Sequence, residues 1–312
     1  AWAATRCLAA QQEDDGDPQA SLETIEALLG RLHGHDLAGI HLLELHLHRL
    51  QVLMSLGRYS QVVDACSRAQ VLLERVLPSW GEFFRTILHM EGAYCAVYLD
   101  PRPETAGRLL ESLEPVDLPG TMRFIARSVR GELELTRGNV RTAALIQRVS
   151  LRYAGNWRSI LGSGSQWELY ILSMCLVTDV ELSPDDAVEL DAGAVRARAT
   201  SLLREILSDP APLQRDIPTL MAFAAAVGLS AVAAEDAGPD RRAVGAELVA
   251  TALAVGTNQT CRLLSHDYLR SRTERLDALA LAQAEERIRS LDRGGLVVHA
   301  ADLAGRLAGE VG

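Results

Sequence analysis

The chain has 312 residues, of which 48% are hydrophobic and 23% charged, a composition typical of folded proteins. Its net charge is -10, whereas surfaces that bind nucleic acid are usually basic, so we expect no direct nucleic-acid contact by this segment. Lysine is absent, and all 31 basic residues are arginine. This excludes a P-loop, a pyridoxal-phosphate Schiff base and a protein-kinase core within these residues, because each depends on a lysine.

The cysteine pattern and the hydropathy of the chain point to a reducing compartment. The five cysteines are widely spaced and form no C-x-x-C pair: Cys7, Cys66, Cys95, Cys175 and Cys261. An odd, scattered set predicts buried thiols rather than a disulfide or zinc framework. The most apolar run, 220–234, is too short to span a bilayer, and no signal peptide precedes it. We therefore expect a cytoplasmic, soluble protein, and a start at Ala1 without methionine suggests a piece of a longer chain.

Turn-forming residues interrupt the chain at nearly regular intervals, and amphipathic helices are predicted between them. The breaks are separated by 41, 43, 38, 45 and 55 residues and lie at Gly16, Gly57, Asp100-Pro101, Gly138, Ser183-Pro184 and Gly238-Pro239. A period of this size is typical of helix pairs stacked into a solenoid. We therefore expect an all-α fold, a right-handed α-α superhelix of helix pairs.

The first predicted helix runs through Gln12, and Asp17 is the expected N-cap of the second. Pro18 then occupies the first helical position, where its missing N–H costs no hydrogen bond. Apolar residues recur every three or four positions in the second and third helices. They are Ile25, Leu28, Leu29 and Leu32, followed by Ile40, Leu43, Leu47, Leu50 and Met54. The third helix is expected to end at Gly57.

Similar apolar stripes continue along the chain. The middle stripes are Phe83, Ile87, Met90, Tyr94 and Val97, then Met122, Ile125, Val129 and Leu133. Ser183, Pro184 and Asp186 resemble a capping box, and we expect the helix that they start to continue through Val195, Ala199, Leu202 and Ile206. A further helix starts at Gly238-Pro239, and its inward residues are predicted to be Val244, Leu248, Thr251 and Val255.

No strand is expected, and only residues 294–298 look locally extended. Two stretches fit the helical rhythm less well: the Gly/Ser run at 162–165, and residues 209–218 with three prolines. We interpret both as candidate hinges within a single repeat array over residues 1–312. Composition shifts are too weak here to favour two separate domains.

The segment 56–69, LGRYSQVVDACSRA, resembles the centre of a tetratricopeptide repeat. In that family a Gly-x-aromatic turn joins two helices, and small residues let them pack closely. The matching residues are Gly57, Tyr59 and Ala69, while Val62 stands where alanine is usual. Residues 138–143 are a weaker second copy, with Val140 in place of the aromatic. The intervals exceed the usual period of about 34 residues, so the chain resembles a long, degenerate version.

Long, degenerate repeats of this kind resemble the C-terminal arms of large actinobacterial transcription regulators. These comprise ATP-binding LuxR-type activators, antibiotic regulatory proteins and relatives of the maltose-regulon activator. Segments 242–253 and 293–304 are similar to the closing helices of those arms, although Val298 and His299 replace a polar cap. The resemblance implies a non-catalytic sensor and scaffold arm that binds a protein partner or a small-molecule inducer. ATP and DNA would then be bound by domains outside this segment. The alternative is a free-standing adaptor that assembles partner proteins.

Few residues suggest chemistry, and we expect no catalytic residue, no cofactor and no metal. His41, Glu44 and His48 share one helix face and could chelate a metal, but such spacing is more often a solvated polar face. The run at 162–165 superficially resembles a nucleophile elbow but lacks the preceding strand, which favours a flexible loop. Residues 258–260 spell a glycosylation sequon that a cytoplasmic chain would not use. A helical enzyme is therefore the least favoured reading.

Aromatic residues gather mid-chain and could line a concave binding face, although filling the space between repeats is the favoured interpretation. They are Trp80, Phe83, Phe84, Tyr94, Tyr98, Phe124, Trp157, Trp167 and Tyr170. Between Arg262 and Arg293 seven arginines alternate with six acidic residues. This pattern predicts an exposed, salt-bridged surface.

Overall fold

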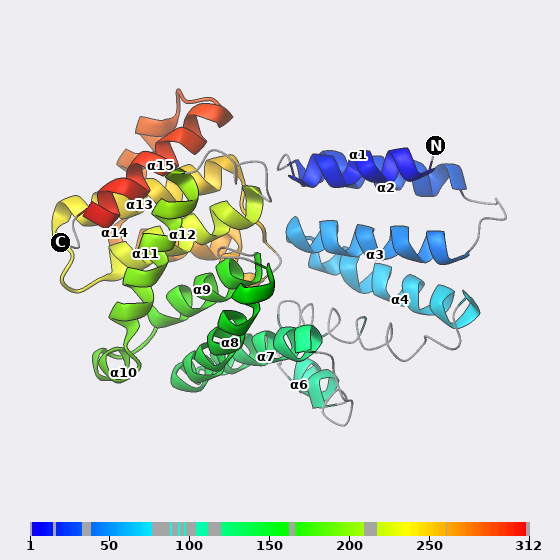
Figure 1. Cartoon of the computed structure of the whole chain (residues 1–312), viewed down its shortest axis with the longest axis horizontal. Helices are drawn as coiled ribbons and strands as arrows, with labels where there is room; N and C mark the ends of the chain where they lie inside the picture. Colours follow the sequence, from blue (N-terminus) through cyan, green and yellow to red (C-terminus); the bar gives the residue numbers. More distant parts are fainter. Residues whose placement is uncertain are drawn as a thin grey trace. The chain divides into compact units, whose positions relative to one another are not determined.

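The chain is all-α. The computed structural model describes residues 2–14, 17–32, 39–76, 88, 93, 97, 104–111, 120–161, 166–208, 217–259 and 261–309. Every regular element within these ranges is a helix, as the sequence predicts (Figure 1). The chain forms two compact units, residues 1–138 and 139–312.

The first unit consists of helices that pack on their neighbours in sequence. They are α1 (Trp2–Asp14), α2 (Pro18–Leu32), α3 (Gly39–Ser55), α4 (Tyr59–Val76), α6 (Glu104–Glu111) and α7 (Gly120–Thr136). Helices α1 to α4 pack each on the next, and α6 packs on α7 (Figure 1). This succession of contacts is the one expected of stacked helix pairs.

Two predicted signals in this unit are confirmed at atomic detail. The Asp17 carboxylate accepts a hydrogen bond of 3.0 Å from the Ala20 N–H, and α2 begins at Pro18. Gly57 adopts a positive φ of 67° after α3, and the Arg58 N–H reaches back 2.9 Å to the Leu53 carbonyl. This is a Schellman turn, which requires a left-handed residue and therefore favours glycine.

The apolar stripes face the interior largely as predicted. The buried members are Ile25, Leu28, Leu43, Leu50, Met54, Val97, Val129 and Leu133. Leu29, Leu32 and Leu47 are half-buried. The side chains of the other stripe members in this part of the chain lie outside the described set. They are Ile40, Met122, Ile125 and the residues from 83 to 94 named above. Gly138, with a φ of 82°, ends the unit just after α7, as its turn signal predicts.

The second unit has eight described α-helices and one 3₁₀ turn. They are α8 (Val140–Leu161), α9 (Gln166–Asp179), α10 (Pro184–Glu189), α11 (Ala192–Ser208), α12 (Ile217–Ala233), α13 (Pro239–Val255), η2 (Arg262–Leu264), α14 (His266–Ile288) and α15 (Arg293–Gly309). As predicted, α13 begins at Pro239 and buries Val244, Leu248, Thr251 and Val255.

Helix α12 is the centre of this unit. All its residues from Pro218 to Val232 are buried, and α9, α11, α13 and α14 pack around it. A helix that is apolar on every side must be enclosed by other elements, which explains this arrangement. None of the described helices is long and apolar enough to cross a membrane.

Contacts between helices that are distant in sequence distinguish the second unit from a simple array. Helix α15 packs on α11 and α13, and α9 packs on α12. In a solenoid each repeat contacts only its neighbours, so a continuous superhelix through this unit is not confirmed. The candidate hinge at 162–165 lies outside the described residues, as does 209–216, whereas Ile217 and Pro218 begin α12. The prediction of a single array over 1–312 stays a prediction.

Two local predictions are wrong. The Ser183 cap is present, since its Oγ accepts a hydrogen bond from the Asp186 N–H, but the helix ends at Glu189. The residues from Val195 onward belong to α11, because Asp191 adopts a left-handed φ of 53° and breaks the helix. Residues 294–298 are the first turns of α15 rather than extended chain. The Asp292 carboxylate caps that helix by accepting 2.7 Å from the Gly295 N–H.

The expectation of buried thiols holds only in part. Cys175 and Cys261 are buried and Cys66 is half-buried, but Cys7 is exposed. Its neighbours in α1, Arg6 and Leu8, are exposed as well. Cys95 lies outside the described residues.

Candidate functional site

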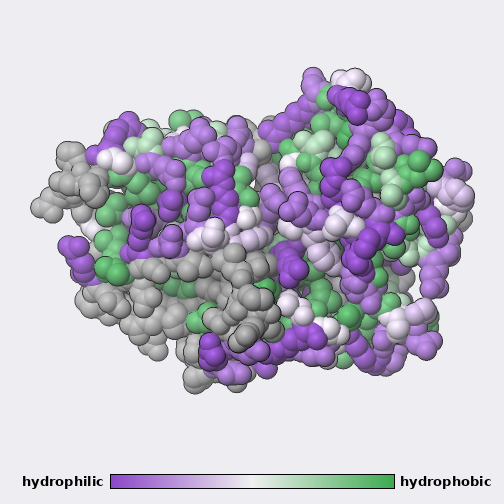
Figure 2. All heavy atoms as spheres, turned by 180° about the vertical axis from the view of Figure 1, so that it is seen from behind, coloured by the Kyte–Doolittle hydropathy of each residue, from purple (hydrophilic) through white to green (hydrophobic). Residues whose placement is uncertain are grey.

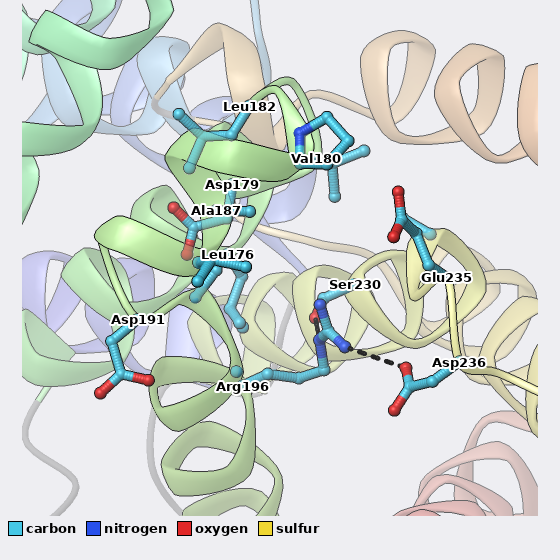
Figure 3. A pocket seen from close by; sticks show the side chains of 15 residues that line it. Leu176, Asp179, Val180, Leu182, Ala187, Asp191, Arg196, Ser230, Glu235 and Asp236 are labelled. Atoms are coloured by element: carbon cyan, nitrogen blue, oxygen red, sulfur yellow. Dashed lines mark hydrogen bonds and ion pairs between the residues drawn. The ribbon is translucent and has the colours of Figure 1, made fainter.

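A cleft of about 570 Å³ opens in the second unit where the ends of four helices meet (Figure 3). Its walls are the end of α9, helix α10, the start of α11, and the end of α12 with the turn that follows. This volume lies within the range of about 300–1,000 Å³ found for small-molecule sites. Several apolar side chains line it, among them Leu176, Val180 and Leu182.

Arg196 lies at one side of the cleft, in the second turn of α11. Its Nε donates a hydrogen bond of 3.1 Å to Ser230 Oγ on α12, and its Nη1 lies 3.8 Å from Asp236 Oδ1. The Arg196 side chain is only 24% exposed, whereas Asp236 is 85% exposed. Burial lowers the pKa of Arg196, and the nearby Asp236 only partly offsets this effect. The guanidinium is therefore a half-buried cation with one loose ionic partner among the described residues.

The opposite part of the wall is fixed by a buried ion pair. Arg148 on α8 donates to both carboxylate oxygens of Asp179, at 2.8 and 3.1 Å, and its Nε donates to the Leu190 carbonyl at 2.8 Å. Burial raises the pKa of Asp179, and the hydrogen bonds from Arg148 oppose that rise. Arg148 thus ties α9 to the joint between α10 and α11, and it neutralises Asp179.

Three further carboxylates border the cleft, and among the described residues only Asp236 has an ion pair, the long one with Arg196. Asp191 lies at the joint before α11, where its Oδ1 accepts a hydrogen bond of 3.3 Å from the Ala194 N–H. Glu235 and Asp236 follow α12 and are exposed. In Figure 3 this turn and Asp191 stand on opposite sides of the cleft, with Arg196 below and Leu182 above. The cleft therefore presents charges of both signs around an apolar wall.

The histidine face predicted from the sequence does not assemble a metal site. His41 Nδ1 lies 3.5 Å from Glu44 Oε2, which also accepts a 3.0 Å hydrogen bond from Arg6. His48 instead bonds to Glu13 on α1, and its side chain is only 16% exposed. The face is thus solvated at His41 and Glu44, which are 41% and 40% exposed, and less so at His48, which bonds to α1. Among the described residues no group of three His, Cys, Asp or Glu side chains could hold a metal ion.

The other sequence candidates are structural or fall outside the described set. Residues 162–165 are outside it, and so is Thr260. Asn258 serves the packing of α12, since its amide donates 3.1 Å to Thr219 and its backbone N–H donates 2.8 Å to Pro218. Of the aromatic side chains singled out above, only that of Tyr170 is described, and it is half-buried. The expectation that these aromatics fill the space between repeats, with a binding face as the alternative, therefore stays a prediction.

The arginine-rich segment near the C-terminus is salt-bridged, as predicted. The pairs are Arg270 with Glu274 and Glu285, Arg272 with Glu181, Arg287 with Glu247, and Arg289 with Glu286. Large apolar side chains are exposed at scattered positions, including Leu279 and Val298. On the face shown in Figure 2 hydrophobic residues are interspersed with hydrophilic ones, which does not single out an apolar docking surface.

Sequence reasoning did not find the cleft. Arg196 carries no motif, and Asp191 and Glu235 stand in the sequence as ordinary loop acids. The nearest signals are the Ser183-Pro184 and Gly238-Pro239 breaks, which place helix ends close to these residues. Nothing in the spacing indicates that the two breaks meet in space.

No family model matches the chain, and no curated protein or solved structure matches it either. The likeness to tetratricopeptide repeats and to regulator arms therefore rests on the residues quoted above.

Proposed function

We propose that this chain is a non-catalytic helical module that binds a ligand or partner, and that the cleft around Arg196 is its binding site. The observation that carries the proposal is a half-buried, loosely paired guanidinium in an open cleft of suitable volume. Charged groups whose pKa is shifted by burial in a cleft are candidates for functional sites, and burial lowers the pKa of Arg196. Among the described lining residues no nucleophile is paired with a base, which favours binding over catalysis.

The position of the cleft supports a sensing role. A ligand there would touch α9, α10, α11 and the turn after α12 together. If its affinity differed between two packings of these helices, binding would shift the population toward one of them. This is the mechanism by which a sensor arm biases a switch domain.

The finer proposal is that the module is the sensor and scaffold arm of a bacterial, actinobacterial-type transcription regulator working in the cytoplasm. It is supported by the tetratricopeptide-like turn at Gly57, by the stacking of α1 to α4, and by the likeness of segments 242–253 and 293–304 to regulator arms. A protein or a small inducer would be the partner. Nucleotide and DNA would bind to other domains.

The complete reading frame that encodes the chain tests this finer proposal. We expect it to contain a P-loop ATPase segment and a helix-turn-helix. A frame with neither would overturn the regulator assignment and favour a free-standing adaptor.

Coupling through the cleft is tested in the complete protein by comparing Arg196→Gln with Arg204→Gln. Arg204 is an exposed residue on the same helix, outside the cleft, and so serves as the matched control. We expect Arg196→Gln to change the rate of ATP hydrolysis about threefold or more, and Arg204→Gln to leave it unchanged. Equal rates for both variants and the wild type would show that the cleft does not act on the switch.

A further inference from the structure

The charges that line the cleft indicate which chemical class of ligand it binds. Four carboxylates line it, namely Asp179, Asp191, Glu235 and Asp236, against the single cation Arg196. Arg148 neutralises Asp179, which leaves an excess of two negative charges among the lining side chains; behind them Arg241 lies close enough to Arg196 to lower its pKa. A purely anionic ligand would be attracted by Arg196 and repelled by the carboxylates. A purely cationic ligand would be attracted by the carboxylates and repelled by Arg196.

Arg196 is positioned to receive a carboxylate. Its Nε is held by Ser230, and its present ionic contact with Asp236 is long, at 3.8 Å, and reaches a side chain that is mostly in water. A ligand carboxylate can approach a guanidinium at about 2.7–2.9 Å with two parallel hydrogen bonds, a stronger contact than the one it replaces. The exchange frees Asp236 to return to solvent.

The acids across the cleft are suited to an ammonium group. Asp191 is held in place by its left-handed backbone and by the Ala194 N–H, so one carboxylate oxygen is committed to the cap and the other is not. Glu235 has no ion pair among the described residues and stands on the facing turn (Figure 3). An ammonium group beside Glu235 would offset one of the two excess negative charges.

An apolar wall completes the site. Leu176, Val180 and Leu182 come from the end of α9 and its following turn, and Ala233 closes the other side. Burying an apolar side chain here would stabilise the complex by about 25 cal/mol for each Å² removed from water. The cleft thus combines one cation, facing carboxylates and an apolar surface within one volume.

We infer that the cleft binds a zwitterion of the α-amino-acid type with a large apolar side chain. Its carboxylate lies on Arg196, its ammonium lies toward Glu235, and its side chain packs on Leu176, Val180 and Leu182. This inference deepens the proposed function and rests on the cleft being its ligand site.

Three matched probes test the inference on the wild-type chain by isothermal titration calorimetry. L-Tryptophan carries both charges, indole-3-propionate lacks the ammonium, and tryptamine lacks the carboxylate. A charged hydrogen bond contributes about 1.5–3 kcal/mol, and 1.4 kcal/mol is a factor of ten. We therefore expect tryptophan to bind at least about tenfold more tightly than either analogue.

Variants assign the two contacts. Arg196→Gln should weaken tryptophan about tenfold and leave tryptamine unchanged or tighter. Glu235→Gln, on an exposed turn where the fold is not at risk, should weaken tryptophan and tryptamine about threefold and not indole-3-propionate. Glu205→Gln, an exposed acid of α11 outside the cleft, should change none of them.

Equal binding of tryptophan and tryptamine would overturn the inference in favour of a cation site, and equal binding of tryptophan and indole-3-propionate would overturn it in favour of an anion site. Binding of none of the probes would overturn it as well. These results are separable from the regulator proposal, because the titration needs no flanking domain. If the reading frame encodes an ATPase and a helix-turn-helix but none of the probes binds, the proposed ligand class is wrong and the regulator proposal stands.

Discussion

Gly228 and Gly245 set the distance between α12 and α13. A Cβ atom added to Gly228 would lie 2.6 Å from the Gly245 carbonyl oxygen, and one added to Gly245 would lie 2.7 Å from the Gly228 carbonyl oxygen. Because the obstacle is backbone, Gly228→Ala should push the two helices apart and lower the free energy of unfolding by about 1–3 kcal/mol. The midpoint of urea denaturation measures this loss.

Gly305 in α15 provides the matched control, since a Cβ there meets nothing within 4 Å. Alanine is the better helix former, so Gly305→Ala should leave stability unchanged or raise it by up to about 1 kcal/mol. If both variants unfolded at the wild-type midpoint, the close crossing of α12 and α13 would be wrong.

Glu247 joins three helices of the second unit through one buried carboxylate. It accepts hydrogen bonds from Arg287 on α14, at 2.6 and 2.8 Å, and from His299 on α15 at 2.7 Å. Burial acts to raise the pKa of Glu247, but these hydrogen bonds outweigh it, and the pKa lies below its ordinary value. Glu247→Gln should therefore lower the free energy of unfolding at pH 7 by about 1.5–3 kcal/mol.

The difference in unfolding free energy between wild type and Glu247→Gln should depend on pH. Because the pKa is lower in the folded than in the unfolded state, the contribution of Glu247 is present above the unfolded value of about 4.3. It is lost as the pH falls through the folded value. The stability difference between wild type and Glu247→Gln should thus be at least as large at pH 5 as at pH 7 and shrink below about 4. A difference that stays constant to pH 3 would contradict the ionic role.

Among the elements, the joint between α10 and α11 depends on Asp191. Its backbone is left-handed, with a φ of 53°, and its carboxylate caps the Ala194 N–H. Asp191→Ala loses the cap and strains the backbone, so it should lower stability by about 1–2 kcal/mol. Asn tolerates the same conformation and can accept the same bond, and Asp191→Asn should stay within about 0.5 kcal/mol of wild type. Thermal unfolding of both variants measures the contrast.

Helix α14 is in fact two helical segments. Asp277 has φ -158° and ψ 81°, and its carboxylate caps the second segment at the Ala280 N–H, 2.9 Å away. Arg270 reaches Glu285 at 2.9 Å, although fifteen residues of straight helix would span about 22 Å. The second segment must therefore fold back on the first. Neither glycine nor proline marks this break, so the sequence gives no sign of it.

At the scale of the whole molecule, the second unit encloses its own core around α12. We expect the fragment 139–312 to fold alone and unfold in one cooperative step, because the helices that pack most extensively on α12 all belong to it. Circular dichroism against urea tests this, and the Gly228→Ala change introduced into the fragment should lower its midpoint as in the full chain. A broad, non-cooperative transition would show that the unit needs residues 1–138.

The sequence predicts local features well where short-range chemistry decides them. Asp17 and Pro18, Gly57, Gly138, Ser183 and Pro239 mark helix ends because capping and backbone conformation depend on a few adjacent residues. Three- and four-residue periodicity likewise identifies much of the buried faces of α2 and α3, whereas α13 is buried on every side from Val244 to Ala252. The mistaken extended segment at 294–298 shows the limit of this reasoning: β-branched residues accept a helix once the rest of α15 packs on α11 and α13.

The amino-acid sequence alone thus determined the helix content, most helix ends and the exclusion of lysine-dependent sites such as a P-loop. Tertiary structure decided the enclosure of α12, the fold-back of α14 at Asp277, and the meeting of Arg196 with Asp191 and Glu235 in one cleft. The reason is that capping and periodicity act over a few residues. Which helix end lies beside which other end depends on packing between elements dozens of residues apart.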